Sequence, residues 1–318
     1  MSHDSNEVVI ADVVYQGGLN RRYLRVQDLQ RLQHAKFTGR RIVEGMYAGR
    51  HASAQRGQSV EFRDYREYMP GDEMNAVDWK VYARSDRLFI KLFENQVEMT
   101  VHLLVDGSAS MAYRGHRSKD KLSKFDQACH LAAAIAFLVT KQNDRVSVSY
   151  AKEGLFGFRR ASNSMRDLLA LLHEMETVRL AGQSQIGTAL KDLVGNCGRR
   201  DLFVIFSDLL EDREELLKSI SICRSRGGEV IVFHVLHDDE VNLPTVDNGL
   251  FIDSENGNRI RLNIRDVREE YEKRIQEFLA GWDLACKGHG VDYNRVLTSD
   301  HYYEVLERYM FRRAARRV

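Results

Sequence analysis

The chain has 318 residues, 43% of them hydrophobic, which is enough for one large domain or two smaller ones with a sizeable core. Its 47 Lys and Arg and 46 Asp and Glu residues leave a formal net charge of +1, so bulk charge gives no reason to expect a nucleic-acid or membrane-surface partner. The sequence opens without a signal-peptide pattern, and its longest apolar stretch, 131–139, is too short to span a bilayer.

Cysteine usage points to a reducing compartment. The four cysteines are far apart and show no Cys-x-x-Cys spacing, so they do not indicate a zinc site. We therefore expect reduced thiols in a cytoplasmic protein at Cys129, Cys197, Cys223 and Cys286.

Two basic segments flank the chain. Leucines at helical spacing predict a modest helix in 23–37, and residues 39–57 are then rich in Arg. The tail 312–317 is also basic and follows a predicted helix, whose dipole it complements. We expect solvated surfaces, with docking of an acidic protein by 39–57 or nucleic-acid binding by both segments as the alternatives.

Residues 57–93 are dense in aromatic and charged side chains around a Pro-Gly-Asp turn at 70–72. Paired arginines and carboxylates hold irregular backbone well, and aromatic rings supply core where aliphatic residues are few. We expect a structural clamp on the edge of the main sheet, in which Arg66 and Arg84 pair with acids and Trp79 is part of the core. The candidate acids are Glu61, Asp64, Asp72 and Asp78.

The stretch 99–111 organises the rest of the chain. An apolar run ends in Asp106, which is followed by Ser108 and Ser110, and the segment 124–139 is apolar on almost every side. Such a run is typical of a strand buried on both faces, as in parallel sheets, and an all-round apolar helix is a buried helix. This strand, turn and helix predict a doubly wound α/β sheet, which binds ligands beyond the carboxyl ends of its strands.

The later elements continue this pattern. A hairpin of 145–150 and 155–158 predicts an antiparallel strand at the sheet edge. Further strands are expected at 202–206, 229–236 and 291–297, helices at 165–175, 264–287 and from 302, and a second hairpin at 249–262. Thr188 opens another helix, near its N-cap, and Asp208 follows the strand 202–206.

Five oxygen-bearing side chains thus lie at strand ends or at the start of a helix: Asp106, Ser108, Ser110, Thr188 and Asp208. Hard oxygens suit Mg²⁺, and also Mn²⁺ or Ca²⁺, but not Zn²⁺. We therefore expect one divalent cation, with a coordination position open for an acidic group of a partner.

These five positions resemble the metal-ion-dependent adhesion site of von Willebrand factor type A domains, in which Asp-x-Ser-x-Ser, a later Thr and a later Asp hold one cation. The preceding segment is similar to the signature of the bacterial domain-of-unknown-function 58 family, except that Asn75 stands where Arg is common. The signature positions, structural or docking, are Glu61, Arg66, Tyr68, Asp72, Asp78, Trp79 and Arg84.

The resemblance implies an N-terminal extension (1–95) with the signature in 57–93, a type A-like domain (96–245) and a C-terminal hairpin with helices packed on that domain (246–318). It implies a non-catalytic adaptor or cofactor for a MoxR-type AAA+ ATPase, which binds that ATPase or its client. The alternatives are a metal-dependent hydrolase or phosphotransferase, and a nucleic-acid-binding protein. A phosphoaspartate-type enzyme would need a second acid two residues after Asp106, where Ser108 stands.

Overall fold

A computed structural model describes residues 21–32, 35–37, 46–48, 59–96, 99–116, 122–254 and 257–315 of the chain. By residue contacts the chain forms two compact units. The α/β unit contains residues 1–38 and 100–318, and the signature unit contains residues 39–99. The basic segment 39–57 and the last residues of the tail lie largely outside the described residues.

The start of the chain belongs to the α/β unit, whereas we expected one extension over 1–95. Tyr23 is buried, and its hydroxyl donates to Asp126, 3.0 Å away. Phe37 is also buried, and its backbone N–H donates to the side chain of Gln142, 2.7 Å away. Both partners lie on or directly after the long buried helix, so aromatic burial decides where this segment packs.

The core of the α/β unit is a six-stranded sheet in the order β11-β8-β7-β4-β5-β6. Every neighbouring pair is parallel except β5 and β6, which are antiparallel at the edge. The strands are β4 (Thr100–Asp106), β5 (Arg145–Ala151), β6 (Leu155–Phe156), β7 (Leu202–Ser207), β8 (Glu229–Leu236) and β11 (Asp292–Leu297). This arrangement confirms the predicted doubly wound, mostly parallel α/β class with an antiparallel edge strand.

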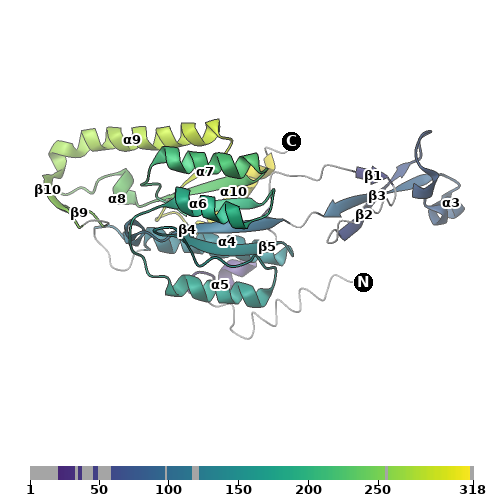
Figure 1. Ribbon diagram of the computed structural model, residues 1–318, viewed down its shortest axis with the longest axis horizontal. Coiled ribbons are helices and arrows are strands. Elements are labelled where there is room, and N and C mark those ends of the chain that lie inside the picture. The colour runs from purple at the N-terminus through teal and green to yellow at the C-terminus, as the bar shows by residue number, and fades with distance from the viewer. Residues whose placement is uncertain are drawn as a thin grey trace. The chain divides into compact units, whose positions relative to one another are not determined.

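Helices cover both faces of this sheet (Figure 1). One face carries α4 (Lys124–Lys141), α5 (Met165–Thr177) and α10 (Tyr302–Ala315), and the other carries α6 (Ile186–Asn196), α7 (Arg213–Ser225) and α9 (Ile264–Gly288). Short helices are α2 (Val26–Leu32), α8 (Asp238–Val241) and the 3₁₀ turn η2 (Ala109–Ala112). No helix in the described ranges is long and apolar enough to cross a membrane.

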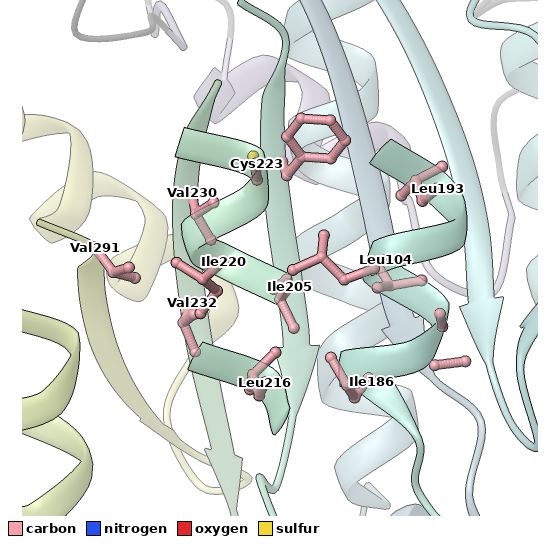
Figure 2. Packing of buried hydrophobic residues seen from close by; sticks show 14 of the residues in the cluster. Leu104, Ile186, Leu193, Ile205, Leu216, Ile220, Cys223, Val230, Val232 and Val291 are labelled. Carbon is pink, nitrogen blue, oxygen red and sulfur yellow. The ribbon is translucent and has the colours of Figure 1, made fainter. Parts of the chain in front are cut away.

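Strand alternation explains the packing. Leu104, Ile205 and Val232 point from neighbouring strands toward α6 and α7, where Ile186 and Leu216 meet them (Figure 2). The residues between them on β4 and β7 are also buried, as expected for strands covered on both faces. The sheet is therefore rigid at its centre, and its strand ends hold fixed positions.

The signature unit contains a three-stranded antiparallel sheet in the order β1-β3-β2. Its elements are β1 (Met46–Ala48), β2 (Ser59–Glu67), the 3₁₀ turn η1 (Met74–Ala76), α3 (Trp79–Ser85) and β3 (Phe89–Gln96). Val77 and Ile90 form its small buried core, with Tyr68 packed against them. The prediction that this unit clamps onto the edge of the main sheet stays a prediction.

A separate hairpin completes the α/β unit. Strands β9 (Asn248–Ile252) and β10 (Arg259–Asn263) pair antiparallel with each other. Gly249 lies against Ile264 at the start of α9, so a Cβ at this position would push against the Ile264 side chain. The hairpin predicted at 249–262 is thus confirmed.

Candidate functional site

Two neighbouring strands bring their terminal acids together. β4 and β7 pair in parallel with Val105 opposite Phe206, so Asp106 and Ser207 end the two strands at the same level, and Asp208 follows. Along the chain, the sheet grows from β4 to one side through β5 and later to the other side through β7. The crevice between such strands is where doubly wound sheets bind ligands.

Asp106 is fully buried and engages both carboxylate oxygens. Its Oδ1 accepts the backbone N–H of Ser108 at 2.9 Å. Its Oδ2 accepts the hydroxyls of Ser207 at 2.6 Å and Ser184 at 2.8 Å. Three donors, from the turn after β4, the loop before α6 and the end of β7, therefore fix the orientation of this carboxylate.

Ser108 and Ser110 connect Asp106 to Asp208. The two hydroxyl oxygens lie 3.1 Å apart, and the Ser110 hydroxyl donates to Asp208 Oδ2 at 2.7 Å. Asp208 is fully buried, and the next residue, Leu209, has a left-handed backbone (φ 54). We call Asp106, Ser108, Ser110 and Asp208 the strand-end site.

Lys124, the first residue of α4, places an ammonium group beside this site. Its Nζ lies 2.8 Å from Asp208 Oδ2 and 2.5 Å from Glu240 Oε1, and its side chain is 1% exposed. Burial alone lowers the pKa of Lys124, but the two carboxylates outweigh it and raise this pKa above its usual value. Lys124 is therefore a buried cation shared between two acids.

The pKa values of Asp106 and Asp208 shift in opposite directions, because only Asp208 contacts the Lys124 ammonium. Burial, and then the charge of Asp208, raise the pKa of Asp106 to about 6. Burial also acts on Asp208, yet the Lys124 ammonium outweighs it and holds the pKa of Asp208 below its usual value. Among the described residues, Asp106 thus has three hydrogen-bond donors but no cationic side chain as a partner.

Thr188 does not join the other four predicted ligands. It is the third residue of α6, whose N-cap is Gln185, and its hydroxyl donates to Glu215 on α7 at 2.9 Å. The hydroxyl that reaches Asp106 from the loop before α6 is that of Ser184. Thr188 lies near the start of α6, as predicted, but Gln185 takes the N-cap position that threonine would normally fill.

A third acid lies at the start of α6. Glu211 Oε2 accepts the backbone N–H of Gly187 at 3.2 Å, while Glu211 Oε1 is buried without a described hydrogen-bond partner. Burial raises the pKa of Glu211 to about 7, only partly offset by the Gly187 N–H. Glu211 adds to the negative charge around Asp106.

These residues fit a small hard cation in part. Two carboxylates and two hydroxyls converge, and acids outnumber the single ammonium. Asp106, Ser108, Ser110 and Asp208 would hold the cation, and Lys124 would share Asp208 with it. Bound there, the cation would supply a Lewis-acidic position for an acidic group of a partner.

A pocket of about 730 Å³ adjoins the site, with Ser110 and Lys124 among its lining residues. The β9 strand, Leu210 and Tyr271 form other parts of its wall. The pocket is lined both by residues of the strand-end site and by the hairpin. The rest of a molecule bound at Ser110 would therefore lie in this pocket.

The signature residues form their own network in the signature unit. Arg66 pairs with Asp72 at 2.8 Å, and Asp72 also accepts the Met69 N–H. Asp78 caps α3 and accepts the Tyr65 hydroxyl at 3.0 Å.

The structure does not confirm the predictions for Trp79 and Arg84, and the prediction for Glu61 stays a prediction. Trp79 is 53% exposed, so the expectation that it supplies core is wrong, and Val77 and Ile90 take that place. Arg84 is exposed and pairs with no carboxylate among the described residues. The side chain of Glu61, in β2, lies outside the described residues.

Sequence reasoning missed Lys124, Ser184, Ser207 and Glu211. A signal existed for Lys124, since a basic residue in the first turn of a helix opposes the helix dipole and so points to an acidic partner. The serines had no such signal, because serine is common in loops beside strands.

Comparisons with known proteins identify a family and several relatives. The family model described as "Protein of unknown function DUF58" matches residues 64–278. Uncharacterized proteins of Mycobacterium bovis and Mycobacterium tuberculosis are 26% identical over 229 residues, which are 71% of this chain and 70% of each relative.

Solved structures give more distant likenesses. BatB from Bacteroides thetaiotaomicron has a TM-score of 0.46 and 15% identity, over 68% of this chain and 99% of that chain. An aerotolerance-related membrane protein from Bacteroides fragilis has a TM-score of 0.46 and 16% identity, over 69% and 99%. The SpRpn10 VWA domain has a TM-score of 0.39 and 9% identity, over 67% and 95%.

Proposed function

Because the chain belongs to the DUF58 family, we propose that its strand-end site serves binding: the protein is a non-catalytic interaction module that captures an acidic group of a partner protein through a divalent cation. Mg²⁺ is the proposed ion, and Mn²⁺ and Ca²⁺ also suit oxygen ligands. One observation carries this proposal. Asp106 and Asp208 are fully buried at neighbouring strand ends, and a single buried ammonium serves only one of them.

The physical reason is the cost of buried charge. An ionised carboxylate inside a protein is stable only with a cation or several donors, and here the pKa of Asp106 is raised to about 6 despite three donors. A divalent ion between Asp106 and the two serines would remove this cost. It would also leave coordination positions for an outside acid.

We propose a MoxR-type AAA+ ATPase, or a client of it, as the partner, which is what the family resemblance implies. A cytoplasmic location belongs to the same proposal. It is supported by the four cysteines, all of which are free.

Calorimetric titration of Mg²⁺ into the purified protein tests the cation step. Asp106→Asn should lose at least about tenfold in affinity, because it removes the charge and keeps the shape. The matched control is Asp167→Asn, a carboxylate that also accepts a serine hydroxyl (Ser162, 2.6 Å) but lies at the start of α5. Equal Mg²⁺ affinity in the wild type and Asp106→Asn would contradict the proposal.

The partner step has its own assay. A purified MoxR-type ATPase from the same organism should bind the wild-type protein in Mg²⁺, and chelator or Asp106→Asn should abolish binding. Binding that survives both changes would overturn the cation-bridged mode. Circular dichroism of each variant separates loss of binding from loss of fold.

Glu211 favours a second candidate, a metal-dependent hydrolase. Its pKa of about 7 suits a general base, and it lies at the same end of the sheet. Hydrolysis of p-nitrophenyl phosphate by the Mg²⁺-loaded protein, lost in Glu211→Gln, would support catalysis. We expect no turnover, because the interaction module needs none.

A further inference from the structure

Three residues of metal-ligating type meet at the end of the sheet opposite the strand-end site. His102 lies in β4, about 13 Å along the strand from Asp106. Cys197 is the C-cap of α6, and Asp201 directly precedes β7. One ring nitrogen of His102, the Cys197 sulfur and a carboxylate oxygen of Asp201 lie within 4.8 Å of one another. A histidine, a cysteine and an aspartate from three different elements thus converge on one place.

The His102 imidazole is held from several sides. The residue is 4% exposed, and its ring stacks on Phe203 with the centroids 5.2 Å apart. In the parallel pairing of β4 with β5, His102 lies opposite Ser147, whose Oγ is 2.7 Å from Nδ1. Its Nε2 lies 3.0 Å from Asp201 Oδ2. The position of the ring is therefore fixed by the sheet itself.

The two ring nitrogens have partners that suit a metal ligand. The Ser147 hydroxyl can accept a hydrogen bond from Nδ1–H, which leaves the Nε2 lone pair to face Asp201. An ion between Nε2 and Asp201 would take the place of the proton that these two groups share. A hydrogen-bond partner on the second ring nitrogen, which fixes the tautomer, is typical of metal-binding histidines.

Cys197 completes the group from the other side of the ring. Its Sγ lies 3.6 Å from His102 Nδ1. Burial, and then the charge of Asp201, raise the pKa of the Cys197 thiol to about 12, only partly offset by the Arg226 guanidinium. This thiol is therefore not an activated nucleophile, although it stands beside a histidine and an aspartate. A metal ion displaces a thiol proton directly, so the raised pKa does not prevent coordination.

The donor set selects the class of ion. Nitrogen, sulfur and oxygen ligands together are typical of Zn²⁺, whereas Mg²⁺ prefers oxygen alone. A thiolate and a carboxylate would also neutralise the two charges of the ion. Ligand atoms of a tetrahedral zinc site lie about 3.5 Å apart, so side-chain movements of about 1 Å would close this group around an ion.

From these observations we propose that His102, Cys197 and Asp201 bind one Zn²⁺ ion, with water as a fourth ligand, at the amino ends of β4 and β7. The ion would join the end of α6 to the start of two central strands. The site is separate from the strand-end site and does not depend on the proposed function. Cysteine spacing along the chain gave no sign of it, because His102 and Cys197 are 95 residues apart.

Optical titration of the full chain with Co²⁺, in a reducing buffer, tests the site. Co²⁺ replaces Zn²⁺ in such sites, and its bond to a thiolate gives an absorption band in the near ultraviolet. The wild type should show this band, and one equivalent of Zn²⁺ should remove it. Cys197→Ser should lack the band. Absence of the band in the wild type, or its survival in Cys197→Ser, would overturn the proposal.

Two variants provide matched controls. Cys286→Ser removes a buried thiol on α9 whose pKa is also about 12, and it should keep the Co²⁺ band. Asp106→Asn changes the strand-end site and should keep the band as well. A band that is lost in Cys286→Ser, or in Asp106→Asn, would assign the ion to another place and overturn the proposal.

Asp201→Asn separates coordination from folding, because it removes the charge and keeps the shape. Zn²⁺ affinity, measured by competition with a chromogenic zinc indicator, should fall about tenfold or more. Asp167→Asn, at the start of α5, should leave it unchanged. Equal Zn²⁺ affinity in the wild type and Asp201→Asn would overturn the role of the carboxylate and with it the three-ligand site.

Unfolding in urea gives a second readout. An ion that binds only the folded chain raises its stability, so Zn²⁺ should shift the wild-type midpoint to higher urea, and chelator should reverse the shift. Cys197→Ser should show a smaller shift, and Cys286→Ser the full one. An equal Zn²⁺ shift in the wild type and Cys197→Ser would contradict the site.

Discussion

Lys124 and Asp208 form an ion pair of 2.8 Å in which the two side chains are 1% and 0% exposed. The pair joins the first turn of α4 to the end of β7, two elements 84 residues apart. Lys124 also contacts Glu240 at the end of the pocket, so one ammonium links the strand-end site to α8. Because of this pair, the pKa of Asp208 is lowered while that of Asp106 is raised. The first two predictions depend on this ion pair.

Lys124→Met should destabilise the protein by about 3–5 kcal/mol in the absence of divalent ions, because it leaves Asp208 as an unpaired buried charge. Mg²⁺ should restore more stability in Lys124→Met than in the wild type, since the ion then replaces a missing cation. Urea unfolding with Mg²⁺ and with chelator measures both effects. A Mg²⁺ effect equal to that of the wild type would contradict a shared site.

The double variant Lys124→Met with Asp208→Asn provides the control for unfolding. Removing both charges should recover much of the stability lost in the single variant, because the cost lies in the unpaired charge. If the double variant is as unstable as Lys124→Met, packing of the lysine stem accounts for the loss.

Thr188→Val should change Mg²⁺ affinity by less than about threefold, whereas Ser110→Ala should weaken it by about tenfold or more. The Thr188 hydroxyl donates to Glu215, while Ser110 lies between Ser108 and Asp208. Calorimetry of both variants makes the comparison. Equal losses would show that Thr188 turns from Glu215 to the cation when the ion binds.

Glu211→Gln should gain stability relative to the wild type as pH rises. The pKa of Glu211 is raised from 4.5 to about 7, so its contribution to stability is full below pH 4.5 and is lost as pH rises through 7. Glutamine has no such loss. The stability difference between variant and wild type should therefore shift toward the variant by about 1–3 kcal/mol between pH 4.5 and 8.

The measurement is urea unfolding at several pH values in chelator. A difference between wild type and Glu211→Gln that stays constant with pH would show that Glu211 titrates near its ordinary value.

Asp78→Ala should weaken the signature unit by about 1–2 kcal/mol, because Asp78 caps α3 through the N–H groups of Lys80 and Val81. Hydrogen exchange of these two amides should accelerate. Glu67→Ala is the control, since Glu67 is 66% exposed on its side chain and pairs only loosely with Arg87 at 3.5 Å. Unchanged exchange in Asp78→Ala would contradict the capping role.

The sequence by itself determined the α/β class and the position of four site residues. The run at 101–105, in which only His102 is polar, and the apolar run at 202–206 indicate strands buried on both faces, and parallel strands end at a common edge. Asp106 and Asp208 directly follow those runs, and Ser108 and Ser110 are tied to Asp106 by two and four residues of chain. The spacing of these four residues along the chain is therefore enough to predict where they lie in the sheet.

Only the tertiary structure decided what surrounds these acids. Whether Thr188 or Ser184 reaches Asp106 depends on the residue at which α6 begins and on the rotation of the helix about its axis. Starting the helix one residue earlier or later would change both. The Lys124 ammonium reaches Asp208 because α4 packs on the sheet at one depth and angle, and the exposure of Trp79 depends on which faces of a small unit find partners. Contacts between distant segments depend on packing, which periodicity along the chain does not encode.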